Sequence, residues 1–200
     1  EATDEPVNWV VLDAEATAYA DFTGTSTLLD LISYLHDREI TFVVAEPNGR
    51  LREVLQVSGV ESGLGAGHVY PSVDEAAKAY LRQLLALEQH VDEAHYYLGR
   101  IAEDADDPSG ALYEYRQVED GREMLVAASR ASVILIDQGR IDEIRAWFGE
   151  LRRQNPEKTE QLYGVECLCC KSRGDGAKSL PFCAYAASGF EVIAPNPAYQ

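Results

Sequence analysis

The first part of the chain alternates short apolar runs with stretches in which apolar residues recur at helical spacing. Residues 9–12 form a brief apolar run that contains β-branched side chains and is flanked by polar residues. Such a run is typical of a central strand in a parallel or mixed sheet that is covered on both faces, so a charge at Val11 would be buried. Leu28, Leu31, Ile32 and Leu35 follow at spacing i, i+3, i+4 and i+7, which places one apolar stripe along a helix.

Further along, the pattern predicts two more strands and two more helices. Residues 40–45 and 68–70 indicate the strands. Between them lies a short helix that ends at Gly59, followed by a flexible loop with glycines at positions 63, 65 and 67. Ser72 and Glu75 form a capping box that opens a longer helix. Strands that alternate with helices predict an α/β layer sandwich, in which the strands at 10–12 and 42–45 are adjacent and parallel.

After about Leu84 the strand pattern stops and only helical periodicity continues. Residues 95–115 predict one helical hairpin, and residues 128–156 predict a second. Asp106 and Gly139, which separate the two helices of each hairpin, are 33 positions apart (139 minus 106). A helix–turn–helix unit with a period of about 34 residues resembles the tetratricopeptide repeat (TPR), a family whose members bind proteins.

A third repeat unit can be aligned through Gly174, but its sequence fits poorly. Pro181 would fall inside its second helix, where proline removes a hydrogen bond and clashes with the preceding turn. We therefore expect residues 178–200 to form a degenerate repeat or a loop-rich tail.

The net charge of the chain limits the classes of partner that it can bind. The 200 residues carry 17 Lys and Arg against 34 Asp and Glu, which gives a net charge of −17. This charge opposes binding to nucleic acid and to anionic lipid, because both require neutralising cations. The sequence contains no apolar run long enough to cross a bilayer, and its first cysteine is Cys167, so a disulfide framework is excluded from most of the fold. We expect a cytoplasmic protein.

Two short sequence segments around the first strand resemble segments of a known protein family. Residues 10–16 read Val-Val-Leu-Asp-Ala-Glu-Ala and residues 21–24 read Asp-Phe-Thr-Gly. They resemble the STAS domain, which is shared by anti-sigma-factor antagonists and the cytoplasmic tails of sulfate-permease-type anion transporters, and the permease version in particular. The resemblance implies that Thr23 occupies the position phosphorylated in the antagonists. It also allows a membrane transporter domain upstream of Glu1, which would place the chain at the cytoplasmic face of the inner membrane.

The family's leading strands have no counterpart between Glu1 and the first predicted strand, so the STAS-like domain is expected to be incomplete at its N-terminus. One edge of the sheet should then be exposed. Because an exposed edge offers unpaired backbone groups to other chains, we expect self-association.

Two surfaces are candidates for binding a protein partner. At the turn before the first helix, hydroxyl side chains can cap free backbone N–H groups, and an added phosphate would meet the positive end of the helix dipole. On the first helical hairpin, aromatic side chains could line a peptide-binding face, with nearby arginines for an acidic peptide end. Ordinary packing between helices explains the same aromatic spacing. The predicted binding residues are Asp21, Thr23, Thr25 and Ser26 in the turn, and Tyr96, Tyr97 and Tyr115, with Tyr113 and Arg116, Arg122, Arg130 and Arg140 beside them.

The sequence supports a catalytic or metal-binding role less well than it supports the two binding surfaces. Asp13, Glu15 and Asp21 cluster near the carboxyl end of a strand, where open α/β sheets place ligands, but solvated loop carboxylates explain them equally. No phosphate-cradling lysine follows the glycines, and no histidine has triad spacing. Cys167 and Cys170 have zinc-knuckle spacing but fall within a predicted helix, with only Cys169 and Cys183 beside them. We predict no catalytic residue, no metal and no cofactor.

The sequence therefore predicts an α/β sandwich of partial STAS type at residues 1–84. TPR-like helical hairpins follow at residues 85–177, with the tail at 178–200. The predicted function is non-enzymatic, a regulatory or protein-interaction chain. The alternatives are a phospho-switch at Thr23, a weak nucleotide-binding module, and a hydrolase that uses Asp13, Glu15 and Asp21.

Overall fold

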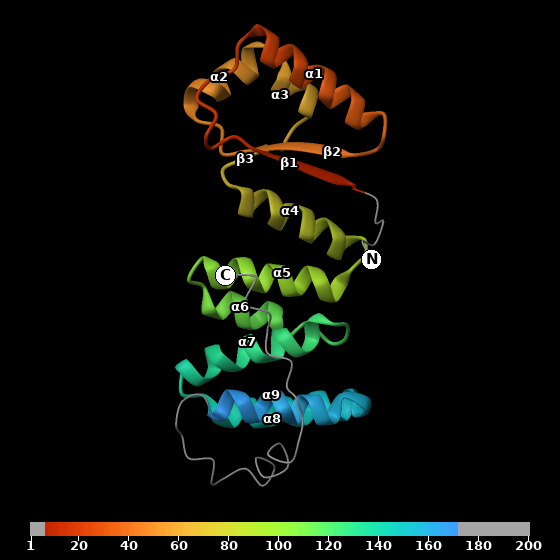
Figure 1. Ribbon diagram of the computed structural model, residues 1–200, viewed down its shortest axis with the longest axis vertical. Coiled ribbons are helices and arrows are strands. Elements are labelled where there is room, and N and C mark those ends of the chain that lie inside the picture. Colours follow the sequence, from red (N-terminus) through yellow and green to blue (C-terminus); the bar gives the residue numbers. More distant parts are fainter. Residues whose placement is uncertain (1–6, 172–200) are drawn as a thin grey trace. The chain divides into compact units, whose positions relative to one another are not determined.

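The computed structural model describes residues 7–171 of the chain (Figure 1). The chain divides into two compact units, Glu1–Leu87 and Glu88–Gln200. The predicted tail at 178–200, Pro181 and Cys183 lie outside the described residues. Among the residues described, no helix combines the length and the hydrophobicity that crossing a bilayer would require.

The first unit is a three-stranded parallel sheet with helices on both faces (Figure 1). The strand order is β1-β2-β3, and Val11 of β1 pairs with Val43 of β2. The predicted adjacent and parallel pairing of the first two strands is therefore confirmed. In chain order the elements are β1 (Trp9–Asp13), α1 (Phe22–His36), β2 (Thr41–Ala45), α2 (Gly49–Val57), α3 (Val60–Leu64), β3 (Val69–Tyr70) and α4 (Val73–Ala86).

The middle strand is β2, and the prediction that residues 9–12 form a covered central strand is wrong. Val43 and Val44 of β2 are 0% and 1% exposed, whereas Val11 of β1 is 36% exposed. Val44 packs into a core with residues of α1, α2 and α3, while Val43 packs with Ala76 of α4 on the other side. Strand β1 is less covered because, among residues 7–171, it has a neighbouring strand on one side only.

Helix α3 corrects a second expectation. Gly63 was predicted to lie in a flexible loop, but it falls within α3. A Cβ at Gly63 would lie 3.4 Å from Cδ2 of Leu29, a residue of α1. Packing against α1 therefore holds a five-residue helix that its own helix propensity would not predict. Ser72 makes its half of the predicted capping box, because its Oγ accepts from the amide of Glu75 at 3.0 Å, while the Glu75 carboxylate accepts from Lys78 at 2.8 Å.

The second unit consists of helices throughout its described part (Figure 1). Helices α5 and α6 form one hairpin, and α7 and α8 form another, followed by a short 3-10 helix and α9. Their bounds are α5 (Val91–Asp104), α6 (Pro108–Tyr115), α7 (Glu123–Asp137), α8 (Ile141–Gln154), η1 (Pro156–Lys158) and α9 (Thr159–Lys171).

The two hairpins turn through the same backbone motif. Asp106 and Gly139, aligned in the sequence, adopt left-handed conformations with φ of 56° and 71°. In both hairpins, the amide of the next residue donates to the carbonyl five residues before it, at 2.9 Å and 2.8 Å. This arrangement is the Schellman motif, which satisfies carbonyls at the end of a helix. The backbone therefore repeats with the 33-residue offset seen in the sequence.

Candidate functional site

The candidate site of the first unit lies where β1 and β2 end and α1 and α2 begin. Asp13 ends β1, and the loop that follows it is tied to the start of α2 by Asn48. The Asn48 side-chain amide donates to the carbonyl of Thr17 at 2.8 Å, while its Oδ1 accepts from the amide of Leu51 at 2.9 Å. One residue therefore caps α2 and holds the loop before α1.

The residue that caps the N-terminus of α1 is an aspartate and not one of the predicted hydroxyl residues. Asp21 is the N-cap, and its Oδ1 accepts from the amide of Gly24 at 2.8 Å. Thr25 lies inside the helix and is only 5% exposed. Its hydroxyl donates to the carbonyls of Asp21 or Phe22, each at 3.1 Å. The expectation that Thr25 is a surface binding residue is therefore wrong, because this side of α1 faces the core.

Asp21, Thr23 and Ser26 are exposed, as predicted for a binding surface. Two aromatic residues that were not predicted lie in the same turn. Phe22, the first residue of α1, is 87% exposed, and Tyr19 is 53% exposed. The signal was a phenylalanine in an otherwise polar turn. We call the set Tyr19, Asp21, Phe22, Thr23 and Ser26 the α1 N-terminal surface.

The carboxylates of the alternative hydrolase hypothesis are Asp13, Glu15 and Asp21, and all three are exposed. Asp13 accepts from the amide of Glu15 at 2.9 Å, and Asp21 is engaged as the helix cap. Within the described residues, no group of three or more His, Cys, Asp or Glu side chains is placed to hold a metal ion. Asp21 supplies negative charge to the α1 N-terminal surface, which also presents the ring of Phe22.

The tyrosines of the second unit do not all lie on one surface. Tyr115 is 0% exposed, so its prediction as a binding residue is wrong. Tyr96 is partly buried, with its ring centroid 6.2 Å from that of Tyr115, and Tyr97 is 51% exposed. Tyr115 is buried because its ring contacts Gly99 on the neighbouring helix α5. Tyr97 and Tyr113 are the members of the set that are exposed to a partner.

Several of the candidate arginines are engaged in internal ion pairs. Arg130 Nη1 contacts Glu103 at 2.9 Å. Arg116 and Arg140 both contact Glu143, at 3.3 Å and 2.8 Å. The hydrogen bond from Arg140 holds the pKa of the Glu143 carboxyl below its ordinary value. These side chains therefore join helices or turns of the repeat, which weakens their case as a clamp for an acidic peptide.

The cysteine cluster can be placed only in part. Cys167 lies on α9, as predicted for a helix, and is 5% exposed. The side chains of Cys169 and Cys170, and the whole of Cys183, lie outside the described part of the chain. Cys167 is therefore a small buried residue of α9.

Comparison with known proteins bears first on the N-terminal part of the chain. A family model described as the STAS domain matches residues 1–76. A stretch of 76 residues is 41% identical to a TPR repeat-containing protein of Pseudomonas aeruginosa, and covers 38% of this chain and 13% of that protein. A stretch of 77 residues is 31% identical to probable sulfate transporters from two strains of Mycobacterium tuberculosis, and covers 38% of this chain and 14% of those proteins.

The chain thus spans about one seventh of the length of the curated relatives it matches. The expected resemblance of the first part to the STAS domain is confirmed, and the helices of the second unit are consistent with TPR-like repeats.

Proposed function

We propose that this chain is a non-enzymatic regulatory and interaction module, whose STAS unit binds a protein partner through the α1 N-terminal surface. The observation that carries the proposal is Phe22, whose side chain is 87% exposed. A large apolar side chain in this position gains free energy when a partner buries it, since burial of a phenylalanine is worth about 1.5–3 kcal/mol. The match to the STAS domain supports the same role.

The negative charge of this chain indicates which side chains the partner should present. Asp21, which precedes Phe22 as the N-cap of α1, is exposed, and the whole chain carries a net charge of −17. A complementary surface would offer a pocket for the ring of Phe22 and Arg or Lys side chains around it. The proposed partner is therefore a protein with an apolar pocket and a basic rim.

Substitution of Phe22 tests this proposal. The wild-type chain, Phe22→Ala and Tyr34→Ala would each be immobilised and used to capture proteins from an extract of the source cells. Tyr34 is a matched control, because it is 53% exposed on the same helix but lies outside the α1 N-terminal surface. Alanine is compatible with a helix at both positions, so the fold should persist.

We expect one partner to bind the wild type and Tyr34→Ala alike, and to fall by about tenfold or more with Phe22→Ala. Equal recovery by all three chains would exclude the α1 N-terminal surface as the binding site.

A phospho-switch at Thr23 is the second candidate function. Thr23 is exposed at the second position of α1, where backbone N–H groups and the helix dipole favour negative charge. Asp21 opposes a phosphate there, because its carboxylate already caps the helix. If Thr23 carries a phosphate in cells, the added charge would alter the affinity of the α1 N-terminal surface for its partner.

The place of the chain in a larger protein is also a proposal. We place it in the cytoplasm, with the STAS unit acting as in the tail of a sulfate-transporter-type protein and the TPR-like unit binding a further protein. The identity to probable sulfate transporters and to a TPR repeat-containing protein supports this arrangement. Reading the gene upstream of Glu1 would test the transporter part, because a transporter requires several apolar spans there.

A further inference from the structure

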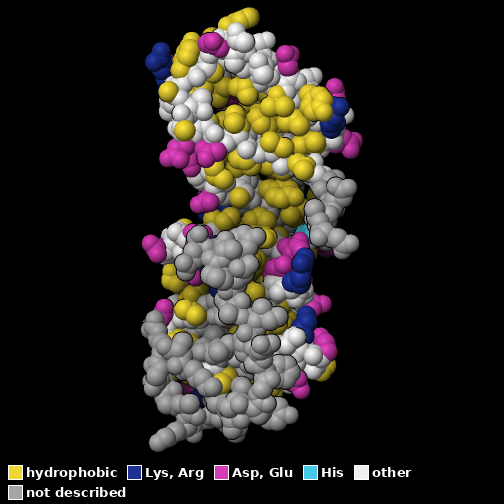
Figure 2. All heavy atoms as spheres, in the orientation of Figure 1, with side chains coloured by type: hydrophobic (Ala, Val, Ile, Leu, Met, Phe, Trp, Pro, Cys, Tyr) yellow, Lys and Arg dark blue, Asp and Glu magenta, His cyan; other side chains and the backbone are white. Residues whose placement is uncertain are grey.

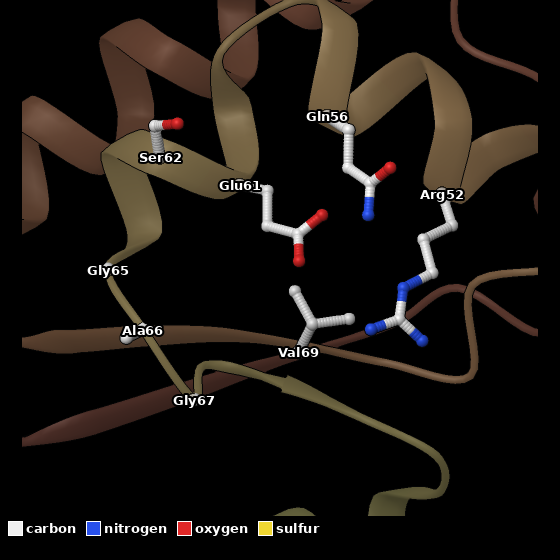
Figure 3. Close-up of a pocket in the computed structure, with 8 residues that line it drawn as sticks. All are labelled: Arg52, Gln56, Glu61, Ser62, Gly65, Ala66, Gly67 and Val69. Atoms are coloured by element: carbon white, nitrogen blue, oxygen red, sulfur yellow. The ribbon is translucent and has the colours of Figure 1, made fainter.

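A groove in the first unit is lined by residues of α2, α3 and β3 (Figure 3). Its volume is about 450 Å³, within the range of sites for small molecules. None of the residues of the α1 N-terminal surface lines it. The lining comes from Arg52 and Gln56 of α2, Glu61 and Ser62 of α3, the loop 65–67 and Val69 of β3.

Glu61 supplies a negative group that lacks a partner. Its carboxylate points into the groove (Figure 3), and its Oε2 atom is shielded from solvent. Within the described residues this oxygen accepts no hydrogen bond. A shielded carboxylate oxygen without a donor is costly, because it has lost water and gained no replacement. A ligand that brings an N–H donor would remove this cost.

Arg52 supplies a positive group to the same groove. It stands one turn before Gln56 on α2, and the two side chains extend to the same space (Figure 3). Among the described residues, the Arg52 guanidinium has no ion pair or hydrogen bond. Its five N–H donors are therefore available to an anionic group such as a carboxylate.

The glycine loop adds backbone donors to the groove, on the side away from Arg52 (Figure 3). Gly65 and Gly67 adopt φ of 91° and 85°, which favours glycine at both positions. The amides of residues 65–67 make no hydrogen bond within the part of the chain that is described. Backbone N–H groups of such a loop can receive an anionic oxygen.

These groups restrict the charge of a ligand. A simple anion such as sulfate would meet the Glu61 carboxylate, and a simple cation would meet Arg52. A molecule that carries both charges satisfies both side chains and leaves the groove neutral. We propose that the groove binds a small zwitterion of the α-amino-acid class, with its ammonium on Glu61 and its carboxylate on Arg52. Ala66 and Val69 offer an apolar wall for an aliphatic side chain.

A matched ligand series tests the proposal. L-valine, valinamide and 2-hydroxyisovalerate have the same side chain, but carry both charges, the positive charge alone and the negative charge alone. L-glutamine adds a zwitterion with a polar side chain. Each would be titrated to about 20 mM into the ¹⁵N-labelled full chain, which detects millimolar dissociation constants through the amide signals of residues 62 and 65–67.

We expect saturable shifts of these signals with at least one zwitterion, and affinities at least about tenfold weaker for valinamide and 2-hydroxyisovalerate. Glu61→Gln and Arg52→Gln should each weaken zwitterion binding by at least about tenfold. Glu53→Gln, an exposed residue of α2 that does not line the groove, should bind like the wild type. Unchanged signals elsewhere in the spectrum would show that each variant is folded.

Three results would overturn the proposal: no saturable shift with either zwitterion, equal binding of 2-hydroxyisovalerate, or equal binding by the groove variants and Glu53→Gln. The first result would mean that Arg52 and Glu61 close on each other in solution and that no ligand is needed. Because the groove shares no residue with the α1 N-terminal surface, its failure would leave the proposed protein-binding function untouched.

Discussion

The hydroxyl of Tyr115 on α6 donates a 2.6 Å hydrogen bond to the carboxylate of Glu103 on α5. The same carboxylate oxygen, Oε2, accepts from Arg130 on α7 at 2.9 Å. One oxygen therefore joins three helices of the second unit. Tyr115 is fully buried, so a hydroxyl without this partner would be an unsatisfied polar group in the core.

This hydrogen bond should make stability depend on alkaline pH. Burial raises the pKa of the Tyr115 hydroxyl above its ordinary value, and the bond to Glu103 raises it further. Only the unfolded chain then loses this proton near the ordinary tyrosine pKa of about 10. Since the raised pKa belongs to the folded state, its stabilising effect is complete below about pH 10 and declines above it. Urea titrations should show the free energy of unfolding decreasing less steeply above about pH 10 in Tyr115→Phe than in the wild type. Equal slopes would contradict the assignment.

A matched pair of glycine substitutions tests the packing around Tyr115. A Cβ at Gly99 would lie 2.6 Å from the Cδ1 and Cε1 atoms of the Tyr115 ring, so Gly99→Ala should destabilise the chain by about 1–3 kcal/mol. A Cβ at Gly149 in α8 would meet nothing within 4 Å. Gly149→Ala should therefore stabilise by about 0.5–1 kcal/mol, because alanine favours a helix over glycine. Thermal unfolding of both variants would be compared, and destabilisation by both would exclude a specific clash at Gly99.

Removing the Phe148 side chain should strongly destabilise the second unit. It is 0% exposed and belongs to the core that α6, α7, α8 and α9 share. Phe148→Ala should lower the free energy of unfolding by about 3–5 kcal/mol. Val133→Ala on α7, a residue 47% exposed, should change it by less than about 0.5 kcal/mol. Denaturant titration measures both, and a loss below about 1 kcal/mol for Phe148→Ala would mean that this core is packed differently.

The two paired valines of the sheet should respond unequally to charge. Val43→Asp would place a carboxylate without a partner in the middle strand, where Val43 is 0% exposed, and should unfold the first unit. Val11→Asp on β1 should cost much less, since Val11 is 36% exposed and its side chain can reach water. Circular dichroism and amide spectra would distinguish the two variants. Loss of the fold in both would show that β1 is covered in solution, as self-association through its edge would predict.

A phosphate mimic at Thr23 should leave the fold intact. Thr23→Glu places a negative charge in the first turn of α1, which the helix dipole favours and Asp21 opposes, so the change in unfolding free energy should stay within about 1 kcal/mol. Thr27→Glu, one turn further along and also exposed, is the control. If Thr23 is a switch, partner capture should change with Thr23→Glu and not with Thr27→Glu. Identical capture by both variants and the wild type would leave Thr23 without a switching role.

Local pattern was sufficient for much of the fold. The apolar run at residues 9–12 and the spacing of Leu28, Leu31, Ile32 and Leu35 predicted a strand and a helix that the structure contains. The 33-residue offset predicted the hairpins, because a helix end needs the same backbone turn wherever it occurs. These features depend on neighbours along the chain, and periodicity records which residues share one side of an element.

The candidate sites were predicted less well, because each depends on which side of an element is covered. Thr25 and Thr23 are both threonines in one turn, yet only Thr25 faces the core. Tyr115 and Tyr113 are two positions apart on α6, and Gly99 of another helix decides that Tyr115 is buried. Spacing shows that two side chains point apart, and it does not show which one meets a neighbour.

The chain order of strands and helices and the repeat offset follow from the sequence, since each rests on hydrogen bonds and periodicity within short segments. The parallel pairing of β1 and β2 follows from the strand–helix–strand order, because the helix between them returns the chain to the same end of the sheet. The middle position of β2, the short helix α3 and the groove between Arg52 and Glu61 were decided only by the folded structure. They arise where segments far apart in the sequence pack together, and the burial that fixes them is a property of those contacts rather than of any single segment.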